Sequence, residues 1–311
     1  METLLYWFAI GGVKSLQFLP LRWVARLGRW VGGFAYYLDS PHRKVAHSNL
    51  TMVFKKERSA REIKALTKEH FRRLGENYAS AIKTASMSQH RLARHLTVVG
   101  VEKIGQSLGS SRGRVVAIGH FGNFELYARA ASGLDGYQFA TTFRALNQPR
   151  LNQLLHQLRS KSGCLFFERR TDSGALREAM THKAIILGLL SDQHAGQGGA
   201  WLPFFGRTCS TNTSAAIFAQ RYKLPLFTAI CYRTALAQWC IEVGNEIPTV
   251  DAGSIRRTAA DIMNDVNHAF EAAIRRDPAN WFWVHNRWRS QKRKQPRIGR
   301  RLRHDGSKPT N

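Results

Sequence analysis

Acidic residues are scarce in this chain. Its 311 residues include 47 Lys and Arg but only 21 Asp and Glu, so the formal net charge is +26. Residues 291–311 contribute +7 of that charge, which leaves +19 for the rest of the chain. Such a field attracts nucleic acid, anionic lipid surfaces or acidic proteins. The sequence has no zinc-finger spacing, helix-turn-helix pattern or RNP-like aromatic strand, which argues against nucleic-acid binding as its main function.

Cysteine is also sparse and unpatterned. The four cysteines, at positions 164, 209, 231 and 240, show no C-x-x-C spacing. We therefore expect ordinary buried thiols in a reducing compartment, not a disulfide framework or a redox motif. No third ligand stands at a recognisable offset from the most conspicuous histidine and glutamate, His120 and Glu125, so no metal site is expected. We expect no cofactor either.

An uncharged apolar run long enough to cross a bilayer is also missing. Residues 3–21 come nearest, but Lys14 and two glycines interrupt them, which makes this stretch a marginal span. The start Met1-Glu2 lacks a basic region, and no small-residue cleavage site follows. A removed signal peptide is therefore not expected.

Arginines then alternate with aromatic and aliphatic residues. Arg22, Arg26 and Arg29 recur among apolar neighbours that include Trp23 and Trp30. This interleaving is typical of an amphipathic helix that lies in the lipid headgroup layer. We expect residues 1–38 to form membrane-associated helices on an anionic surface, at the cytoplasmic face of the inner membrane. The alternative is that these helices simply pack on the rest of the protein.

The body of the chain predicts an α/β fold. Short β-branched or aromatic runs predict strands at 97–101, 114–118, 138–142, 164–167, 184–190, 226–232 and 239–243. Helical patterns separate most of them, so we expect a mixed, mostly parallel sheet flanked by helices over residues 39–290. Residues 291–311, rich in cations, glycine and proline, are predicted to be a disordered tail.

Two helices outside this alternation have clear signals. Ser59, with Glu62 three residues later, is a candidate capping box that opens a helix through Leu74. Residues 256–276 carry apolar side chains at four-residue steps, including Ile262 and Phe270, and this spacing favours core packing over chemistry.

The segment from Val115 to Glu125 holds the most informative residues. A buried strand breaks at Gly-His-Phe-Gly-Asn and delivers His120 and, five residues on, Glu125. On one continuous helix these two would point about 140° apart, but a corner between strand and helix removes that objection. The carboxylate could then hold one ring nitrogen and leave the other as a base. The alternative is a histidine near a helix start beside a surface glutamate.

With its flanks, this segment resembles the H-x4-D/E block of the lysophospholipid acyltransferase superfamily, in particular the bacterial lipid A late acyltransferases (lauroyl and myristoyl transferases). Further blocks are similar in order. They are residues 43–54, then 143–149 with Ala145 in place of the usual proline, then Asp192-Gln193 with 203–206 and 210–219, and finally the tryptophan-rich 278–288. The glycine-rich segment 194–199 departs from what we expect of the enterobacterial enzymes, which leaves the acceptor open.

The resemblance implies a single glycerolipid-acyltransferase-like domain that moves a fatty acyl chain from a thioester to a hydroxyl of a membrane lipid. The donor would be acyl carrier protein or coenzyme A, and the acceptor a lipid A precursor. A thioester is already activated, so a base and oxyanion donors suffice. His120 would be the base and Glu125 its orienting partner.

The other candidate residues would bind substrate. Arg144, and with it Arg169 or Arg170, offers planar donors for phosphate or an oxyanion, with a surface ion pair as the alternative. Asn147 lies in the same block as Arg144. Asp192 and Gln193, at a strand end, would shape the site or hold the acceptor, with a helix cap or turn as the alternative.

Three tryptophans of the last block, at positions 281, 283 and 288, are expected in the core or at the membrane and not in the site. Two other functions stay open. One is acylation of another lysophospholipid, aminolipid or glycolipid, and the other is a noncatalytic basic membrane-binding protein.

Overall fold

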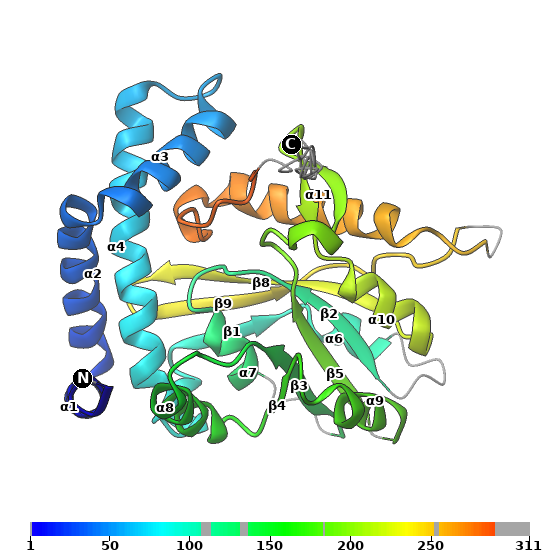
Figure 1. Ribbon diagram of the computed structural model, residues 1–311, viewed down its shortest axis with the longest axis horizontal. Coiled ribbons are helices and arrows are strands. Elements are labelled where there is room, and N and C mark those ends of the chain that lie inside the picture. The colour runs from blue at the N-terminus through cyan, green and yellow to red at the C-terminus, as the bar shows by residue number, and fades with distance from the viewer. Residues whose placement is uncertain (1, 107–112, 131–135, 183, 252–254, 290–311) are drawn as a thin grey trace, which may run out of the picture.

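The computed structural model describes residues 2–106, 113–130, 136–182, 184–251 and 255–289, and it has the expected α/β architecture (Figure 1). The predicted tail, 291–311, lies outside these residues. Seven strands form one sheet in the order β1-β9-β8-β2-β5-β3-β4, in which only β8 and β9 pair antiparallel. Their bounds lie within three residues of the predicted ones: β1 (Leu96–Val99), β2 (Arg114–Ile118), β3 (Gln138–Phe143), β4 (Leu165–Glu168), β5 (Ile185–Leu190), β8 (Leu226–Ala235) and β9 (Gln238–Val243).

A second, two-stranded sheet was not predicted. Strands β6 (Ala200–Phe204) and β7 (Arg207–Thr211) pair antiparallel across a tight turn. Phe205 and Gly206 both have positive φ there, at 52° and 69°, which is the handedness that a two-residue hairpin turn requires. The hairpin follows the end of β5 and leads into α10 (Ser214–Tyr222).

Helices cover the two faces of the main sheet unequally. The large helices α9 (Ser173–His182), α10 and α11 (Ala259–Arg276) pack on the face that contains Val115 and Ala117. The opposite face, with Val116 and Ile118, packs in a separate cluster with smaller elements. These are α5 (Gln89–Leu92), α6 (Val101–Gln106) and α7 (Tyr127–Ala130). The second face is therefore the more thinly covered one.

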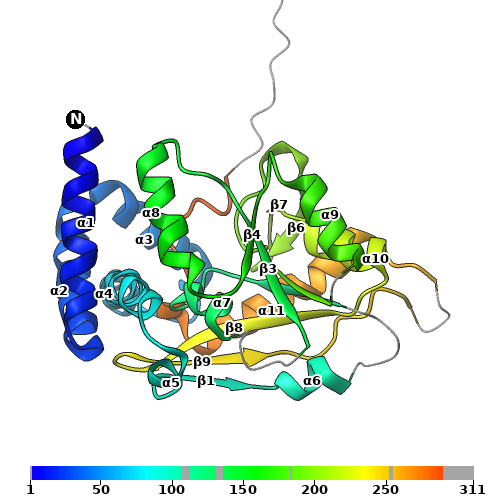
Figure 2. The ribbon, with the colours of Figure 1, turned by 90° about the horizontal axis from the view of Figure 1, so that it is seen from below.

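Helix α4 (Ala60–Ala85) stands across one end of the sheet, with α2 (Leu21–Leu38) along its outer side (Figures 1 and 2). The capping box predicted at its start is present, since the side chains of Ser59 and Glu62 each bond the other's backbone N–H. Glycines let α2 and α4 approach closely: a Cβ on Gly28 would lie 2.5 Å from the carbonyl oxygen of Gly75. The remaining long helices are α1 (Glu2–Phe18), α3 (Ser40–Phe54) and α8 (Pro149–Ser160).

The outward side of α2 is aromatic and cationic. Leu21, Val24 and Ala25 are buried, whereas Trp23 and Trp30 are 60% and 79% exposed. One side of α2 therefore packs on the protein, as the alternative interpretation expects, while its other side is exposed. Among the helices of the described ranges, none has the length and apolar character needed to cross a membrane.

Candidate active site

The strand register brings His120 and Asp192 together. In the parallel pair β2 and β5, Ile118 lies opposite Leu190, and each of the two candidate residues follows two positions later. Both therefore leave the same carboxyl edge of the sheet side by side, which is where open α/β sheets gather reactive groups. Gly119 permits the contact, because a Cβ there would lie 2.6 Å from the Phe121 ring and 3.2 Å from Cγ of Asp192.

Asp192 holds the imidazole with both of its oxygens. Nδ1 of His120 lies 2.8 Å from Oδ1 of Asp192, and the backbone N–H of His120 donates to Oδ2 at 2.9 Å. Since a carboxylate only accepts, Nδ1 carries the proton of the neutral ring and Nε2 has the free lone pair. This is the arrangement of a histidine poised as a base.

Asp192 remains ionised although it is buried. Its side chain has no exposed surface, and Nε1 of Trp281 donates a further hydrogen bond to Oδ2 at 2.8 Å. Burial alone raises the pKa of this carboxyl, but the facing His120 and the hydrogen bonds from His120 and Trp281 outweigh it and hold the pKa below its ordinary 3.8. The fixed charge can stabilise an imidazolium when one forms.

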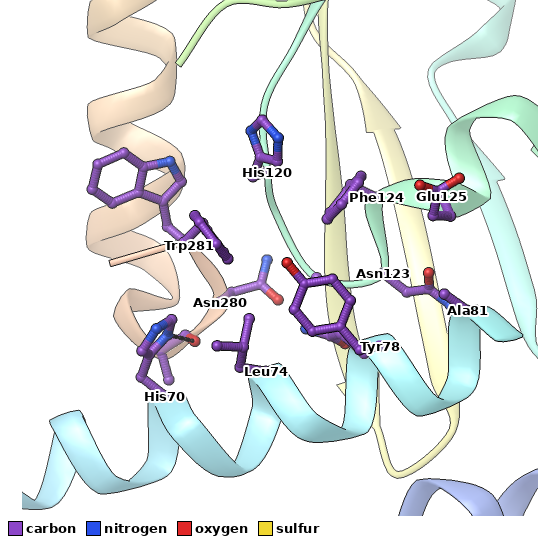
Figure 3. Close-up of a pocket in the computed structure, with 14 residues that line it drawn as sticks. His70, Leu74, Tyr78, Ala81, His120, Asn123, Phe124, Glu125, Asn280 and Trp281 are labelled. Atoms are coloured by element: carbon purple, nitrogen blue, oxygen red, sulfur yellow. Dashed lines mark hydrogen bonds between the residues drawn. The ribbon is translucent and has the colours of Figure 1, made fainter. Parts of the chain in front are cut away.

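The predicted contact between Glu125 and His120 is absent from the described structure, and Asp192 takes that place. Glu125 lies in the 3₁₀ turn η1 (Phe124–Leu126), and the ring of Phe124 stands between its side chain and that of His120 (Figure 3). Its carboxylate instead forms a two-pronged ion pair with Arg159 of α8, in which Nε donates at 3.0 Å. The assignment of Glu125 as the direct orienting partner is corrected accordingly.

Aromatic rings fix the histidine on its other sides. The ring of Phe124 lies edge-on to His120 with centroids 4.8 Å apart, and Phe282 lies tilted at 5.7 Å. Tyr78 of α4 points its hydroxyl into the small cavity that these residues line (Figure 3). His120 is thus restrained while 15% of its side chain stays accessible.

A large groove opens from His120 over the thinly covered face of the sheet. Its accessible volume is about 1030 Å³, and its walls are mostly apolar. His120, Glu125 and Arg159 line it near the carboxyl edge, and strands β2, β3, β5, β8 and β9 contribute its floor. Burial raises the pKa of the Cys164 thiol in this wall to about 12, so no thiolate nucleophile stands there.

The other predicted residues divide into two groups. Arg144, Arg169 and Gln193 line the groove. The first two lie side by side, because the backbone N–H of Arg169 donates to the carbonyl of Phe143 at 3.0 Å. Asn147 and Arg170 are exposed and do not contribute to the groove wall.

The tryptophan-rich block does more than fill the core, contrary to expectation. Trp281 donates a hydrogen bond to Asp192. The fully buried Arg287 donates to the carbonyls of Gln193 and Ser210. Nε2 of His285 accepts a hydrogen bond from the backbone of His194 at 3.0 Å, and burial lowers the pKa of this imidazole to about 4. The block therefore holds the loop that carries Asp192. Its resemblance was visible in the sequence, but its contact with Asp192 was not.

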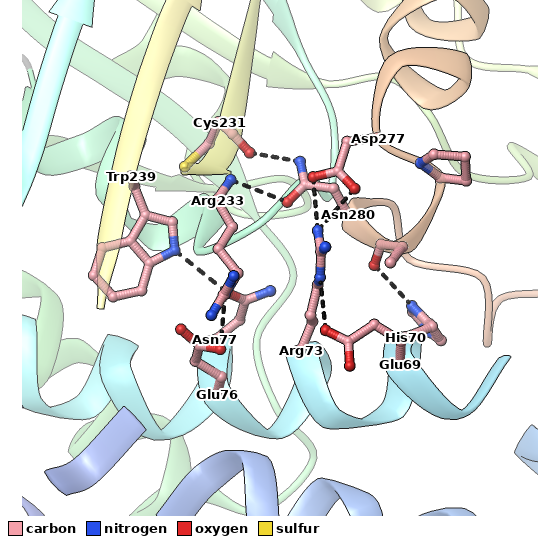
Figure 4. A network of polar contacts seen from close by, with 12 residues as sticks. Glu69, His70, Arg73, Glu76, Asn77, Cys231, Arg233, Trp239, Asp277 and Asn280 are labelled. Atoms are coloured by element: carbon pink, nitrogen blue, oxygen red, sulfur yellow. Dashed lines mark hydrogen bonds and ion pairs between the residues drawn. The ribbon is translucent and has the colours of Figure 1, made fainter. Parts of the chain in front are cut away.

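A polar network anchors this block to α4 (Figure 4). Arg73 bridges Glu69 and Asp277, and Asn280 of the turn η4 (Pro278–Asn280) donates to the carbonyl of Cys231 at 2.9 Å. The fully buried Glu76 accepts hydrogen bonds from Arg29 of α2 and Arg233 of β8. These contacts fix the position of the neighbouring Trp281.

Known proteins are similar to this chain over nearly its whole length. Residues 1–290 match the family described as bacterial lipid A biosynthesis acyltransferase. The lipid A biosynthesis palmitoleoyltransferase of Escherichia coli (strain K12) is 23% identical over 290 residues, which is 92% of each chain. The lauroyltransferase of the same organism is 23% identical over 291 residues, and the lipid A biosynthesis acyltransferase of Shigella flexneri is equally similar.

Proposed function

This chain belongs to the bacterial lipid A biosynthesis acyltransferase family, and we propose that it transfers a fatty acyl chain from a thioester to a hydroxyl of a lipid A precursor. The observation that carries the proposal is the His120–Asp192 pair at the mouth of a long apolar groove. The pair supplies a base, and the groove suits an acyl chain, whose burial gains about 0.8 kcal/mol per methylene.

The chemistry follows from the proton positions. Nε2 of His120 takes the proton of the acceptor hydroxyl as its oxygen attacks the thioester carbonyl. The resulting imidazolium, stabilised by Asp192, then returns that proton to the leaving thiolate. The carboxylate of Glu125 accepts hydrogen bonds from Nε and Nη2 of Arg159, so Nη1 can donate to the substrate in the groove. Arg159, held by Glu125, thus contacts the substrate, whereas Asp192 contacts the base.

Arginines at the groove mouth suit an acidic donor. Arg144, Arg169 and Arg170 are exposed at the adjacent ends of β3 and β4. We assign them to the phosphate of the phosphopantetheine arm and to the acidic surface of acyl carrier protein, with coenzyme A as the other donor. We therefore expect the KM for the carrier-protein thioester to rise steeply with salt, and the KM for the coenzyme A thioester to rise less.

The outward side of α2 suits an anionic membrane. Tryptophans beside arginines favour the headgroup layer, and Arg26 lies 5.2 Å from the ring centroid of Trp23. We place the protein at the cytoplasmic face of the inner membrane, where α2 would bring the groove near its lipid acceptor. The N-terminal segment 1–38 is then the membrane-associated part, and residues 39–290 the acyltransferase domain.

A second acceptor class is supported by the loop after Asp192. Ala195, Gly198 and Gly199 line the groove, so this glycine-rich segment, which departs from the enterobacterial pattern, stands where the acceptor would bind. Another lysophospholipid, aminolipid or glycolipid is therefore the second candidate acceptor. Lipid analysis after gene deletion distinguishes the two.

The experiment is acyl transfer by detergent-solubilised protein, with labelled acyl carrier protein thioester and a panel of acceptors that includes a lipid A precursor. We expect transfer by the wild type and its loss in His120→Ala with folding intact. Transfer that persists in His120→Ala contradicts the mechanism. A protein that transfers to no acceptor contradicts the function and favours the noncatalytic membrane-binding alternative.

A further inference from the structure

Gly188 leaves a gap in the floor of the groove. It lies in the middle of β5, flanked across the sheet by Val116 of β2 and Thr141 of β3. The same row continues to Phe227 of β8 and Phe166 of β4. In parallel strands, paired residues point to the same face of the sheet. Gly188 is therefore the one position in this row of five without a side chain.

A Cβ on Gly188 would be close to one side chain, that of Ile118. A Cβ built there would meet only Cδ1 of Ile118 at 3.3 Å and the carbonyl oxygen of Ala140 at 3.9 Å. Both neighbours lie beside the glycine in the sheet, and Gly188, Val116 and Ile118 all line the groove. A larger side chain at this position would therefore project into the groove.

Backbone conformation does not require this glycine. Its φ is not in the positive range, unlike that of Gly122 at 51°, and a glycine inside a strand is otherwise unfavourable. The position also lies deep in the groove, since four residues along a strand, at about 3.3 Å each, separate it from Asp192. A short acyl chain attached near His120 would not reach it, whereas a long one would pass over it.

We propose that Gly188 sets the length of acyl chain that the enzyme accepts, by leaving room in the groove floor for the distal part of a long chain. The inference rests on the proposed acyl transfer for the identity of the occupant. Filling the gap would exclude long chains and leave short ones unaffected.

The test is a chain-length profile of Gly188→Val, measured in two ways. The first is displacement of a fluorescent fatty acid by saturated fatty acids from octanoate to palmitate, which needs no catalysis. The second is transfer from the matching acyl carrier protein thioesters. We expect the variant to lose about tenfold in affinity and in kcat/KM for the longest chains, about 1.4 kcal/mol, with little change for the shortest.

Two further variants separate specificity from damage to the fold. Gly174→Val changes a glycine of α9 that has no atom within 4 Å of its Cβ position and does not line the groove, so it should keep the wild-type profile. Ile118→Val removes the Cδ1 atom that the new Cβ meets, so Gly188→Val with Ile118→Val should regain part of the long-chain binding.

The outcomes are distinct. An unchanged length profile in folded Gly188→Val, or an equal loss at every chain length, overturns the proposal. A wild type that transfers nothing contradicts the proposed function, while the displacement profile still decides the role of Gly188.

Discussion

Nδ1 of His120 lies 2.8 Å from Oδ1 of Asp192, a residue 72 positions later in the chain. The contact joins the ends of two paired strands, and a third hydrogen bond from Trp281 fixes the same carboxylate. The proposed base, its charged partner and a hydrogen-bond donor to that partner thus come from three distant segments.

Asp192→Asn should abolish most of the activity. An amide cannot stabilise the imidazolium as a carboxylate does, so we expect kcat to fall about 10²- to 10⁴-fold while KM for the donor changes little. Single-turnover transfer assays measure this directly, with circular dichroism to verify folding. Near-normal kcat in a folded Asp192→Asn protein would show that Asp192 is not the partner of the base.

Glu125 and Arg159 should behave as one unit. Glu125→Gln and Arg159→Gln each break the same ion pair, so we expect similar losses that do not add in the double variant, with a coupling of about 0.5–3 kcal/mol. A double-mutant cycle on kcat/KM measures this coupling. Fully additive losses would mean that the two side chains act independently.

Trp281→Phe should slow catalysis without unfolding the protein. The variant keeps an aromatic ring but loses the N–H that donates to Asp192, and a hydrogen bond to a charged group contributes about 1.5–3 kcal/mol. We expect kcat to fall about 10-fold or more at unchanged KM. Trp283→Phe is the matched control, because its N–H donates only to the carbonyl of Pro278, so stability and not kcat should change. Equal kcat losses in both variants would contradict a specific role for Trp281.

The buried His70 should make the protein less stable in mild acid. Burial lowers the pKa of this imidazole from 6.5 to about 4. Between these values the unfolded chain binds a proton that the folded protein does not, so stability falls as the pH drops from about 6.5 to about 4 and then levels off. The full cost is on the order of 3 kcal/mol. His70→Gln should show a smaller decrease in Tm between neutral pH and pH about 5, and an equal decrease would refute the assignment.

Gly75→Ala should separate α2 from α4. A Cβ at this position would lie 2.1 Å from the carbonyl oxygen of Gly28, so the helices must move apart, at a cost of about 1–3 kcal/mol. Gly12→Ala in α1 is the control, because no atom lies within 4 Å of its Cβ position. Chemical denaturation of both variants tests the expectation. Equal unfolding midpoints for the two variants would contradict the close packing of α2 on α4.

Trp23→Ala with Trp30→Ala should weaken binding to anionic vesicles about tenfold or more. Both side chains are largely exposed on α2, and interfacial binding scales with the apolar area that enters the headgroup layer. Co-sedimentation with anionic and with zwitterionic vesicles measures the effect. Ile255→Ala removes another apolar side chain, 69% exposed, and should leave binding unchanged. A double variant that still binds like the wild type would rule out α2 as the membrane contact.

The sequence by itself determined the local features of this protein. Each main-sheet strand shows as a short β-branched or aromatic run, the capping box at Ser59 depends on residues three apart, and the glycine-rich turn places His120 directly after a strand. The hairpin of β6 and β7 was not predicted, because Pro203 and the two-residue turn obscure the alternating pattern of its strands.

Only the tertiary structure decided which residue holds His120. The sequence favoured Glu125 because it is near in the chain, but Phe124 lies between the two side chains and Arg159, brought in by α8, takes the carboxylate. Asp192 becomes the partner because the register of β2 with β5 aligns Ile118 with Leu190. Register depends on hydrogen bonds between segments far apart in the chain, and no local pattern encodes which two strand ends will meet.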